Sequence, residues 1–341
     1  MTFKVDIEQW ETIVQVETGQ TILEAALTQG VPYPYGCRFG NCGTCRSKLI
    51  EGTVEMAKYS DFALSTKERE RGFVLACRAS PTSDSKVAWR EPDEFAAHPY
   101  RELTCRVFRI EAVTHDIKRI LLDIESGGPF RFSAGQYVEF GAGGLAPRHF
   151  SMANRPVHKR LEFHVRRVSG GEASCYVCDH LKEGEIVRIT GPFGSSYLRE
   201  NHRGPILAIA GGTGLAPVKS IVESALFTGT QQPIYLYFGV RQERDLYLHD
   251  LFAQLAQQHN NFTFIPVLSE ADAGNGRRTG LVHDAVAADF ESFDDFKAYL
   301  AGPPVMVEAA AAMLTERGMR REDIHADAFY TSADLAAADA R

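Results

Sequence analysis

The sequence lacks two features that would place it among membrane or nucleic-acid-binding proteins. No apolar run approaches the roughly 20 residues that a membrane helix needs. The 341 residues carry a net charge of −7, without the basic excess that favours a nucleic acid. Residues 1–6 also lack the basic-then-apolar order of a secretory signal peptide. We therefore expect a cytoplasmic, monomeric protein of two or three domains that binds neither membranes nor nucleic acid.

Cysteine is scarce, with seven residues, but four of them have an informative spacing. Four residues separate Cys37 from Cys42, two separate Cys42 from Cys45, and 31 separate Cys45 from Cys77. This is the spacing of plant-type [2Fe-2S] clusters, which pass single electrons. A zinc site usually has two close cysteine pairs, and a disulfide framework needs a small secreted chain, so both alternatives fit less well. We expect the other cysteines to be unpaired thiols: Cys105, Cys175 and Cys178.

Residues 1–93 have the pattern of one small α+β domain. Residues 12–16 alternate like a strand. Thr21 and Glu24 form a capping box that begins a helix, and the cysteine loop follows it. This layout resembles the β-grasp fold of ferredoxins. The stretch around residues 94–102 has mixed charge and a proline, which favours a linker.

Three arginines follow cluster cysteines directly in the sequence: Arg38, Arg46 and Arg78. One interpretation is that they are solvated loop charges. The other is a basic rim around the cluster, which would attract an acidic partner and favour the reduced cluster. We take this rim as the hypothesis for docking of an electron acceptor.

Residues 103–200 contain short alternating strands separated by glycine and proline turns, the pattern of an antiparallel β-barrel. Within this segment, residues 148–151 combine an arginine, an aromatic ring and a hydroxyl, which suit the diphosphate, the rings and the polar edge of a flavin. Gly170 and Gly171 then lead into a helix, and such a helix start can bind an anion. Together the two segments resemble the R-x-Y-S and G-x-x-S motifs that hold FAD in the ferredoxin–NADP reductase superfamily.

The resemblance implies roles for the matching residues. Arg148 and Ser174 would contact the diphosphate, and Phe150, which replaces the family's usual tyrosine, would stack on the flavin. The candidate catalytic residues are Ser151, which would approach flavin N5, and Phe329, which would cover the flavin. The implied FAD contacts are Arg148, His149, Phe150, Ser151, His164, Val165, Arg166, Gly171, Ala173, Ser174 and Phe329.

Residues 201–331 alternate buried strands with helices, which predicts an α/β domain with a doubly wound parallel sheet. The glycine-rich turn at 211–217 would let a pyrophosphate approach backbone N–H groups. It resembles the nicotinamide-binding loop of the same superfamily, and residues 302–304 resemble its C-G-P-P motif, with Ala301 in place of the cysteine. We expect residues 332–341 to form a flexible tail. The implied NAD(P) contacts are Gly212, Thr213, Gly214, Pro217, Arg241, Gly302, Pro303 and Pro304.

The choice between NADH and NADPH depends on the residues after the second strand of this domain. Arg241 and Arg244 could bind a 2′-phosphate, whereas Glu243 and Asp245 would repel it. We expect NADH, because the nearest relatives use it, and leave NADPH open.

The order of ferredoxin, flavin barrel and nicotinamide domain resembles the reductase components of bacterial aromatic-ring-hydroxylating dioxygenases, in particular the naphthalene dioxygenase type. The resemblance implies hydride transfer from NADH to FAD and single-electron transfer through the cluster to a Rieske-type ferredoxin or Rieske oxygenase. Two alternatives change only the partner, to a soluble di-iron monooxygenase or to an enzyme of deoxysugar synthesis. An alternative of another class is a non-catalytic carrier or redox sensor.

Overall fold

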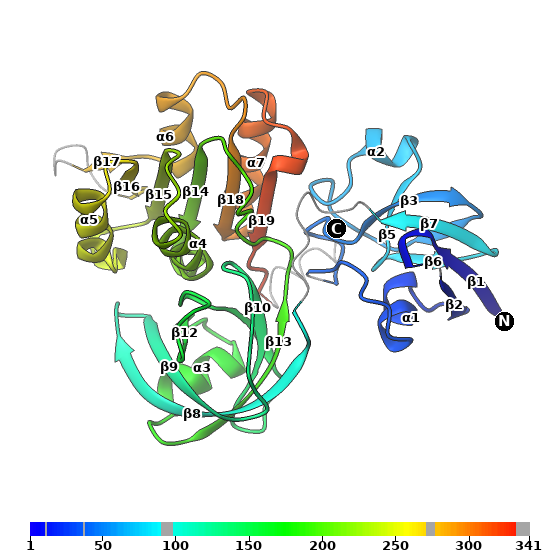
Figure 1. The fold of residues 1–341 in the computed structure, drawn as a ribbon, viewed down its shortest axis with the longest axis horizontal. Coiled ribbons are helices and arrows are strands. Elements are labelled where there is room, and N and C mark those ends of the chain that lie inside the picture. Colours follow the sequence, from blue (N-terminus) through cyan, green and yellow to red (C-terminus); the bar gives the residue numbers. More distant parts are fainter. Residues whose placement is uncertain (11, 37, 90–97, 271–276, 332–341) are drawn as a thin grey trace. The chain divides into compact units, whose positions relative to one another are not determined.

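The structure is a computed structural model that describes residues 1–10, 12–36, 38–89, 98–270 and 277–331. The chain forms two compact units (Figure 1). The first comprises Met1–Phe95 with Phe193–Ser195, and the second comprises Ala96–Pro192 with Ser196–Arg341. The predicted tail, 332–341, lies outside the described residues.

The first unit has the expected β-grasp fold. Its main sheet has the order β2-β1-β7-β3-β5, in which β1 pairs antiparallel with β2 and parallel with β7. The predicted capping box begins α1, because the Thr21 side chain accepts a hydrogen bond from Glu24 N and the Glu24 carboxylate accepts one from Thr21 N. The elements are β1 (Thr2–Ile7), η1 (Glu8–Trp10), β2 (Thr12–Glu17), α1 (Ile22–Thr28), β3 (Arg46–Glu51), β4 (Val54–Met56), α2 (Thr66–Glu70), β5 (Phe73–Leu75), β6 (Ala79–Pro81) and β7 (Ser85–Trp89).

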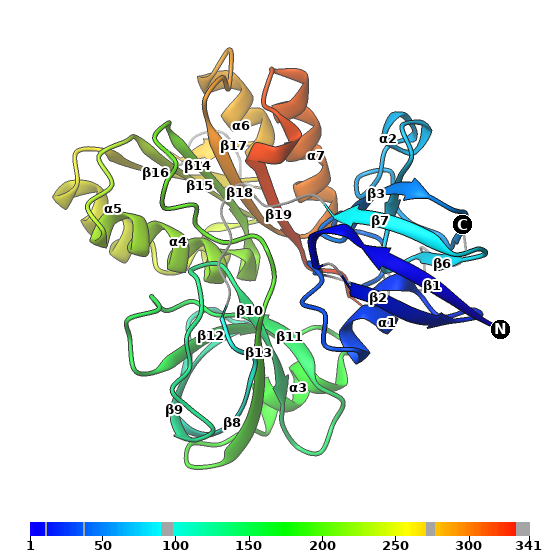
Figure 2. The same ribbon diagram turned by 45° about the vertical axis from the view of Figure 1, so that its right-hand side comes forward.

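The second unit begins with the antiparallel flavin barrel, whose strand order is β11-β10-β13-β8-β9-β12 (Figure 2). An isolated bridge between Met152 and Phe163 links the ends of this sheet. Strand β8 already begins at Arg101, so the last two residues of the predicted linker belong to the barrel. The elements are β8 (Arg101–Ala112), β9 (Ile117–Ser126), β10 (Tyr137–Gly141), β11 (Arg148–Ser151), β12 (Leu161–Arg166), α3 (Glu172–Asp179) and β13 (Ile186–Phe193).

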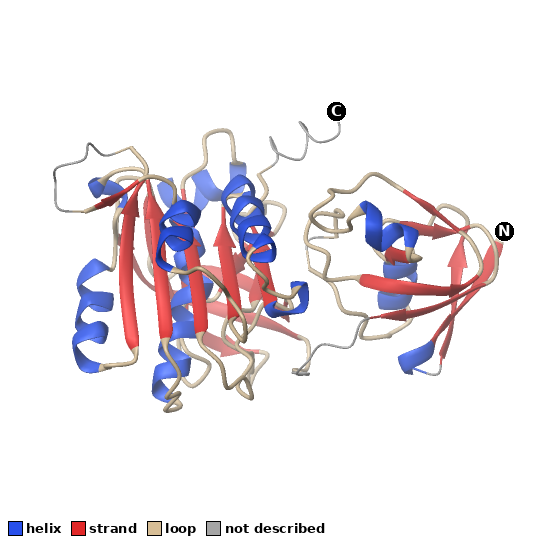
Figure 3. Cartoon of the chain, turned by 90° about the horizontal axis from the view of Figure 1, so that it is seen from above, coloured by secondary structure: helices blue, strands red, loops and turns tan. Residues whose placement is uncertain are grey.

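The rest of the second unit is the predicted parallel sheet, with helices flanking its strands (Figure 3). The 3₁₀ turn η3 does not continue into α5, because Leu248 has a φ of 55°, which is incompatible with a continuous right-handed helix. The elements are β14 (Ile206–Gly211), η2 (Gly212–Gly214), α4 (Leu215–Phe227), β15 (Ile234–Val240), η3 (Glu243–Asp245), α5 (His249–Gln258), β16 (Phe262–Leu268), β17 (Arg278–Thr279), α6 (Val282–Asp289), β18 (Lys297–Gly302), α7 (Pro304–Glu316), η4 (Arg321–Asp323) and β19 (Ile324–Ala328).

The strand order of this sheet, β17-β16-β15-β14-β18-β19, positions a ligand site. The chain proceeds outward from β14 in one direction through β15 and β16, and later returns to the other side of β14 as β18. Ligands of such sheets bind at the carboxyl ends of the strands where this reversal occurs. The glycine-rich η2 lies directly after β14, at that edge. Among the described residues, no helix is both long and apolar enough to cross a membrane.

Candidate functional site

Three of the four predicted cluster ligands are described, and their thiols lie close together. Cys45 and Cys77 are buried and Cys42 is half-buried, whereas Cys37 lies outside the described residues. Contact with the Cys77 thiol, then burial, then the Cys42 sulfur raise the pKa of Cys45 well above its usual value. Thiols crowded in this way are unfavourable as thiolates without a cation, and irons would supply that charge. The described residues therefore fit a [2Fe-2S] cluster.

The backbone of the cluster loop requires glycine at position 43. Gly43 has a φ of +75°, and a Cβ there would lie 2.8 Å from the Ala63 carbonyl oxygen. A side chain would therefore be strained and would displace the loop that carries Cys42 and Cys45.

The prediction that Arg46 belongs to an exposed docking rim is wrong. Arg46 is buried, its Nη1 lies 2.9 Å from Glu68 Oε1, and its Nη2 donates to Ala63 O at 2.8 Å. The carboxylate of Glu68 neutralises the charge of Arg46 inside the domain, and the Arg46 side chain holds the cluster loop. Arg38 is exposed and lies over the Tyr35 ring, 4.6 Å from its centroid. Arg78 is half-buried and donates from Nε to Lys58 O.

Strand β11 presents the predicted flavin residues in an arrangement that suits the isoalloxazine ring and the diphosphate of FAD. Arg148 and His149 are exposed, and the half-buried Phe150 ring packs on Phe140 at 5.4 Å between centroids. Ser151 is buried and its hydroxyl donates to Asp327 Oδ2 at 3.2 Å. Asp327, on β19 two residues before Phe329, was missed by the sequence analysis, which had no signal to connect it with Ser151.

Helix α3 begins as an anion site would, although the Ser174 hydroxyl is already used. Its N-cap is Gly171, which makes no side-chain cap, so the first-turn N–H groups are not satisfied by a capping side chain. The Ser174 hydroxyl accepts from Val168 N and donates to Gly171 O. Ser174 and its neighbour Ala173 therefore offer the diphosphate their backbone N–H groups.

Strand β12 turns two of the predicted FAD residues away from a ligand. The His164 side chain has an exposed fraction of 0% and bonds to Glu162 and Tyr247, each at 3.0 Å, so its ring is not presented to a ligand. Val165 is buried in the barrel core. Only their backbone groups remain available to FAD.

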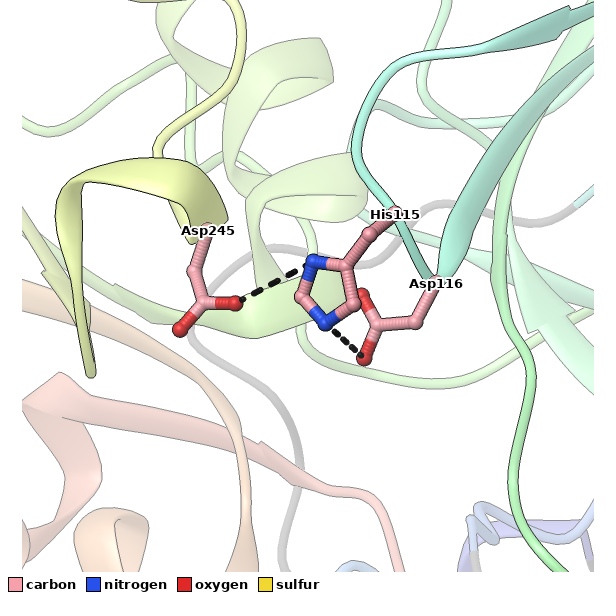
Figure 4. A group of neighbouring side chains, drawn as sticks. All are labelled: His115, Asp116 and Asp245. Carbon is pink, nitrogen blue, oxygen red and sulfur yellow. Dashed lines mark ion pairs between the residues drawn. The ribbon is translucent and has the colours of Figure 1, made fainter.

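Arg166 belongs to an ion-pair cluster with His115, Asp116, Asp245 and Arg241, which could not be foreseen because its members come from three separate segments. His115 lies between the two carboxylates, 3.7 Å from Asp245 Oδ1 and 3.8 Å from Asp116 Oδ2 (Figure 4). Arg166 Nε donates to Asp116 Oδ2 at 2.7 Å, and Arg241 Nε lies 3.4 Å from Asp245 Oδ2. Each carboxylate thus faces a guanidinium, and we assign the group to charge compensation rather than to a metal.

The nicotinamide loop is defined by very close backbone contacts. A Cβ at Gly214 would lie 2.0 Å from the Ala301 carbonyl oxygen, so η2 and the end of β18 pack main chain against main chain. Phe329 N donates to Gly302 O at 2.9 Å, which brings the C-terminal segment to the same edge. Gly212 and Thr213 lie in η2 beside this contact, Pro217 is in the first turn of α4, and Pro303 and Pro304 begin α7. At Gly212 a Cβ would meet only Arg166 Nη1, at 3.4 Å, so the loop is open to a pyrophosphate there and fits a dinucleotide.

Of the three other cysteines, which are unpaired as expected, Cys175 and Cys178 contact backbone carbonyls in the barrel domain. Cys175 Sγ donates to Val168 O, and Cys178 Sγ lies 3.6 Å from Val165 O. Burial raises the pKa of Cys178 to about 11, so it stays a thiol at neutral pH.

Three family models match the chain in the order of its domains. The "2Fe-2S iron-sulfur cluster binding domain" matches residues 5–82, the "Oxidoreductase FAD-binding domain" residues 104–197 and the "Oxidoreductase NAD-binding domain" residues 208–312.

Similar proteins cover nearly the whole chain. The ferredoxin–NAD(P)+ reductase component of the naphthalene 1,2-dioxygenase system of Pseudomonas putida is 39% identical over 93% of this chain and 96% of its own length. The reductase component of a Pseudomonas phenol 2-monooxygenase is 38% identical over 100% of this chain and 98% of its own. The crystal structure of the Amycolatopsis cytochrome P450 reductase GcoB has a TM-score of 0.76 and 38% identity, covering 96% of this chain and 99% of that one.

The Gly214 contact predicts that Gly214→Ala weakens NAD+ binding more than tenfold, because the new methyl group would force η2 away from β18. FAD content should be unchanged. Calorimetric titration with NAD+ measures the effect. Gly141→Ala is the matched control, since a Cβ there meets its nearest neighbour at an ordinary 3.7 Å. Equal NAD+ affinity in Gly214→Ala and wild type would contradict this account of the loop.

The burial of His164 predicts that stability falls as pH drops below about 6.5, the ordinary pKa of histidine. Burial lowers the pKa of His164 despite its bond to Glu162, so at that pH the unfolded chain binds a proton that the folded chain does not. His164→Gln keeps polar contacts and removes the titration. Thermal unfolding between pH 7.5 and 5.5 should show a shallower pH slope in this variant, by up to about 1.4 kcal/mol per pH unit. Identical slopes would show that folding does not lower the pKa of His164.

Proposed function

Because the chain belongs to the family of oxygenase reductase components that join a [2Fe-2S] domain to FAD- and NAD-binding domains, we propose that it passes electrons from NADH to a Rieske-type ferredoxin or ring-hydroxylating oxygenase in aromatic degradation. The observation that carries the proposal is the near-complete alignment with reductases of naphthalene dioxygenase systems, all three domains included. When bound, FAD accepts a hydride and releases electrons one at a time to the cluster.

The described side chains have defined tasks in this proposal. Arg148 and the N-terminus of α3 hold the FAD diphosphate, and Phe150 and Phe329 enclose the flavin rings. Ser151 presents its hydroxyl oxygen to the flavin edge while its proton is directed to Asp327, which fixes the hydroxyl rotor. The glycines of η2 admit the dinucleotide, with Gly302, Pro303 and Pro304 beside the nicotinamide.

The ion-pair cluster supports NADH over NADPH. Arg241 would meet a 2′-phosphate, but it already lies 3.4 Å from Asp245 and 4.0 Å from Asp116. Two carboxylates would therefore face the phosphate, whereas a free ribose diol can donate to Asp245.

A phenol-type monooxygenase is a second candidate acceptor, supported by the relative that spans the whole chain.

A cytoplasmic location belongs to the same proposal and is supported by the unpaired thiols of the described residues Cys105, Cys175 and Cys178. We also propose that the chain is a monomer. Of the three arginines of the predicted basic rim, Arg38 and Arg78 remain candidates for docking the electron acceptor.

Removing the negative charge of Asp245 should weaken the preference for NADH over NADPH. Asp245→Asn keeps an acceptor for Gln242 N, which now donates to Asp245 Oδ2. We expect the ratio of kcat/KM for NADPH to that for NADH to rise about tenfold, corresponding to roughly 1.4 kcal/mol. Asp284→Asn, with an exposed side chain on α6, makes the same charge change as a control. An unchanged ratio would remove Asp245 from the specificity argument.

Reduction of a purified acceptor tests the function itself. With NADH as donor, a Rieske-type ferredoxin should be reduced rapidly and more slowly as salt rises, because the docking is electrostatic. Arg38→Gln should slow this step several-fold at low salt, whereas Lys67→Gln, on α2, should not. Ferricyanide reduction should be equal in all three proteins.

Two outcomes of this experiment decide between the candidates. Rapid reduction of a phenol monooxygenase component, without reduction of the Rieske-type ferredoxin, would show that the acceptor is a phenol-type monooxygenase. An Arg38→Gln variant as fast and as salt-dependent as wild type would show that docking lies elsewhere.

A further inference from the structure

A chain of buried polar side chains connects the flavin barrel to the nicotinamide domain within the second unit. Glu162 and His164 lie on β12, Lys219 lies on α4, and Tyr247 follows η3. All four are buried. Lys219 Nζ lies 3.2 Å from Glu162 Oε2, His164 Nε2 is 3.0 Å from Glu162 Oε1, and His164 Nδ1 is 3.0 Å from the Tyr247 hydroxyl.

The charges of this network decide which side chain donates in its central hydrogen bonds. Burial alone would raise the pKa of Glu162, but bonds from His164 and Arg119 and the charge of Lys219 outweigh it, so Glu162 is a carboxylate. His164 must then donate from Nε2 to it. Because His164 is neutral, its Nδ1 accepts the proton of Tyr247.

The two ends of the network touch both halves of the reaction site. At the nicotinamide end, the Tyr247 hydroxyl also donates to the Gly212 carbonyl oxygen in η2 at 3.4 Å, so its one proton is shared between His164 Nδ1 and this carbonyl. At the flavin end, Lys219 Nζ donates to Ala153 O at 3.1 Å and Ser220 Oγ donates to Asn154 O at 2.7 Å. Those carbonyls follow Ser151 by two and three residues.

Cohesion of the two domains does not require such a network. Burying charges costs several kcal/mol per ion unless they are well paired, and apolar side chains of similar size often stabilise a junction equally well. What a bonded network adds is a single defined geometry. Hydride transfer depends on such geometry, since a misplacement of about 1 Å can cost a hundredfold in rate.

We infer that Lys219 and Tyr247 are positioning residues, which fix the dinucleotide loop at Gly212 against the segment after Ser151 and so set the distance of hydride transfer. Neither residue touches the reacting atoms. The inference rests on the hydride step of the proposed function and is independent of which acceptor takes the electrons.

The chain offers a matched pair of buried tyrosines for the test. Tyr247→Phe and Tyr237→Phe each remove one buried hydroxyl, and that of Tyr237 donates to Asp289 on α6, away from the junction. In full-length protein carrying FAD and cluster, Tyr247→Phe should slow flavin bleaching by NADH about tenfold, with a larger isotope effect from 4-deuterated NADH. The amides of Gly212–Leu215 should also exchange deuterium several-fold faster. Tyr237→Phe should change neither.

A matched pair of buried lysines gives an independent test. Lys219→Met breaks the junction, whereas Lys297→Met breaks a comparably buried pair with Asp323 inside the nicotinamide domain. Both should lower the thermal unfolding temperature, but only Lys219→Met should slow flavin bleaching and speed exchange in η2. If Lys219→Met does not fold, the tyrosine pair decides.

Two results would overturn the inference. One is wild-type bleaching and wild-type exchange in Tyr247→Phe. The other is equal slowing in Tyr237→Phe, which would mean that the effect follows general destabilisation. Because bleaching by NADH needs no protein acceptor, failure here is distinguishable from failure of the proposed partner.

Discussion

The meeting of strand ends at one edge of the parallel sheet is the constraint on which the nicotinamide half of the site depends. Backbone atoms of Gly214 and Ala301 approach so closely that only glycine fits, and the Phe329 amide is bonded to Gly302. This contact brings the glycine-rich loop, the Gly-Pro-Pro turn and the C-terminal aromatic together. Asp327, on the same C-terminal strand, then reaches Ser151 of the barrel. The flavin strand and the dinucleotide loop are thereby held in one unit.

Charge within this unit is compensated locally. Arg166 and Arg241 face Asp116 and Asp245, and Lys219 and Arg119 face Glu162. Among the described residues, the cations left for anionic cofactors are those without a carboxylate close by, such as the exposed Arg148, which bonds to the Ala146 and Pro147 carbonyls. In the ferredoxin unit, Arg46 likewise forms an ion pair with Glu68 of the same domain.

Local sequence patterns were sufficient for the fold and for the cofactors, because cysteine spacing, glycine turns and strand–helix alternation are encoded in neighbouring residues. The capping box of Thr21 and Glu24 was foreseen for the same reason. Side-chain direction was not foreseen. His164 matched a family position, yet β12 turns its ring into a junction formed by residues distant in sequence, and Arg46 was assumed exposed although α2 supplies an acidic partner. The left-handed backbone of Leu248, which no propensity indicated, delays the start of α5 to His249.

The most direct test of the account is an anaerobic titration of the purified protein with NADH, followed by visible absorption. FAD takes two electrons and the cluster one, so an intact path should consume about 1.5 NADH per chain and bleach both the flavin and the iron–sulfur bands. An endpoint near one NADH per chain, with the iron–sulfur bands unchanged, would contradict the account, because the cluster would then be absent or disconnected from the flavin.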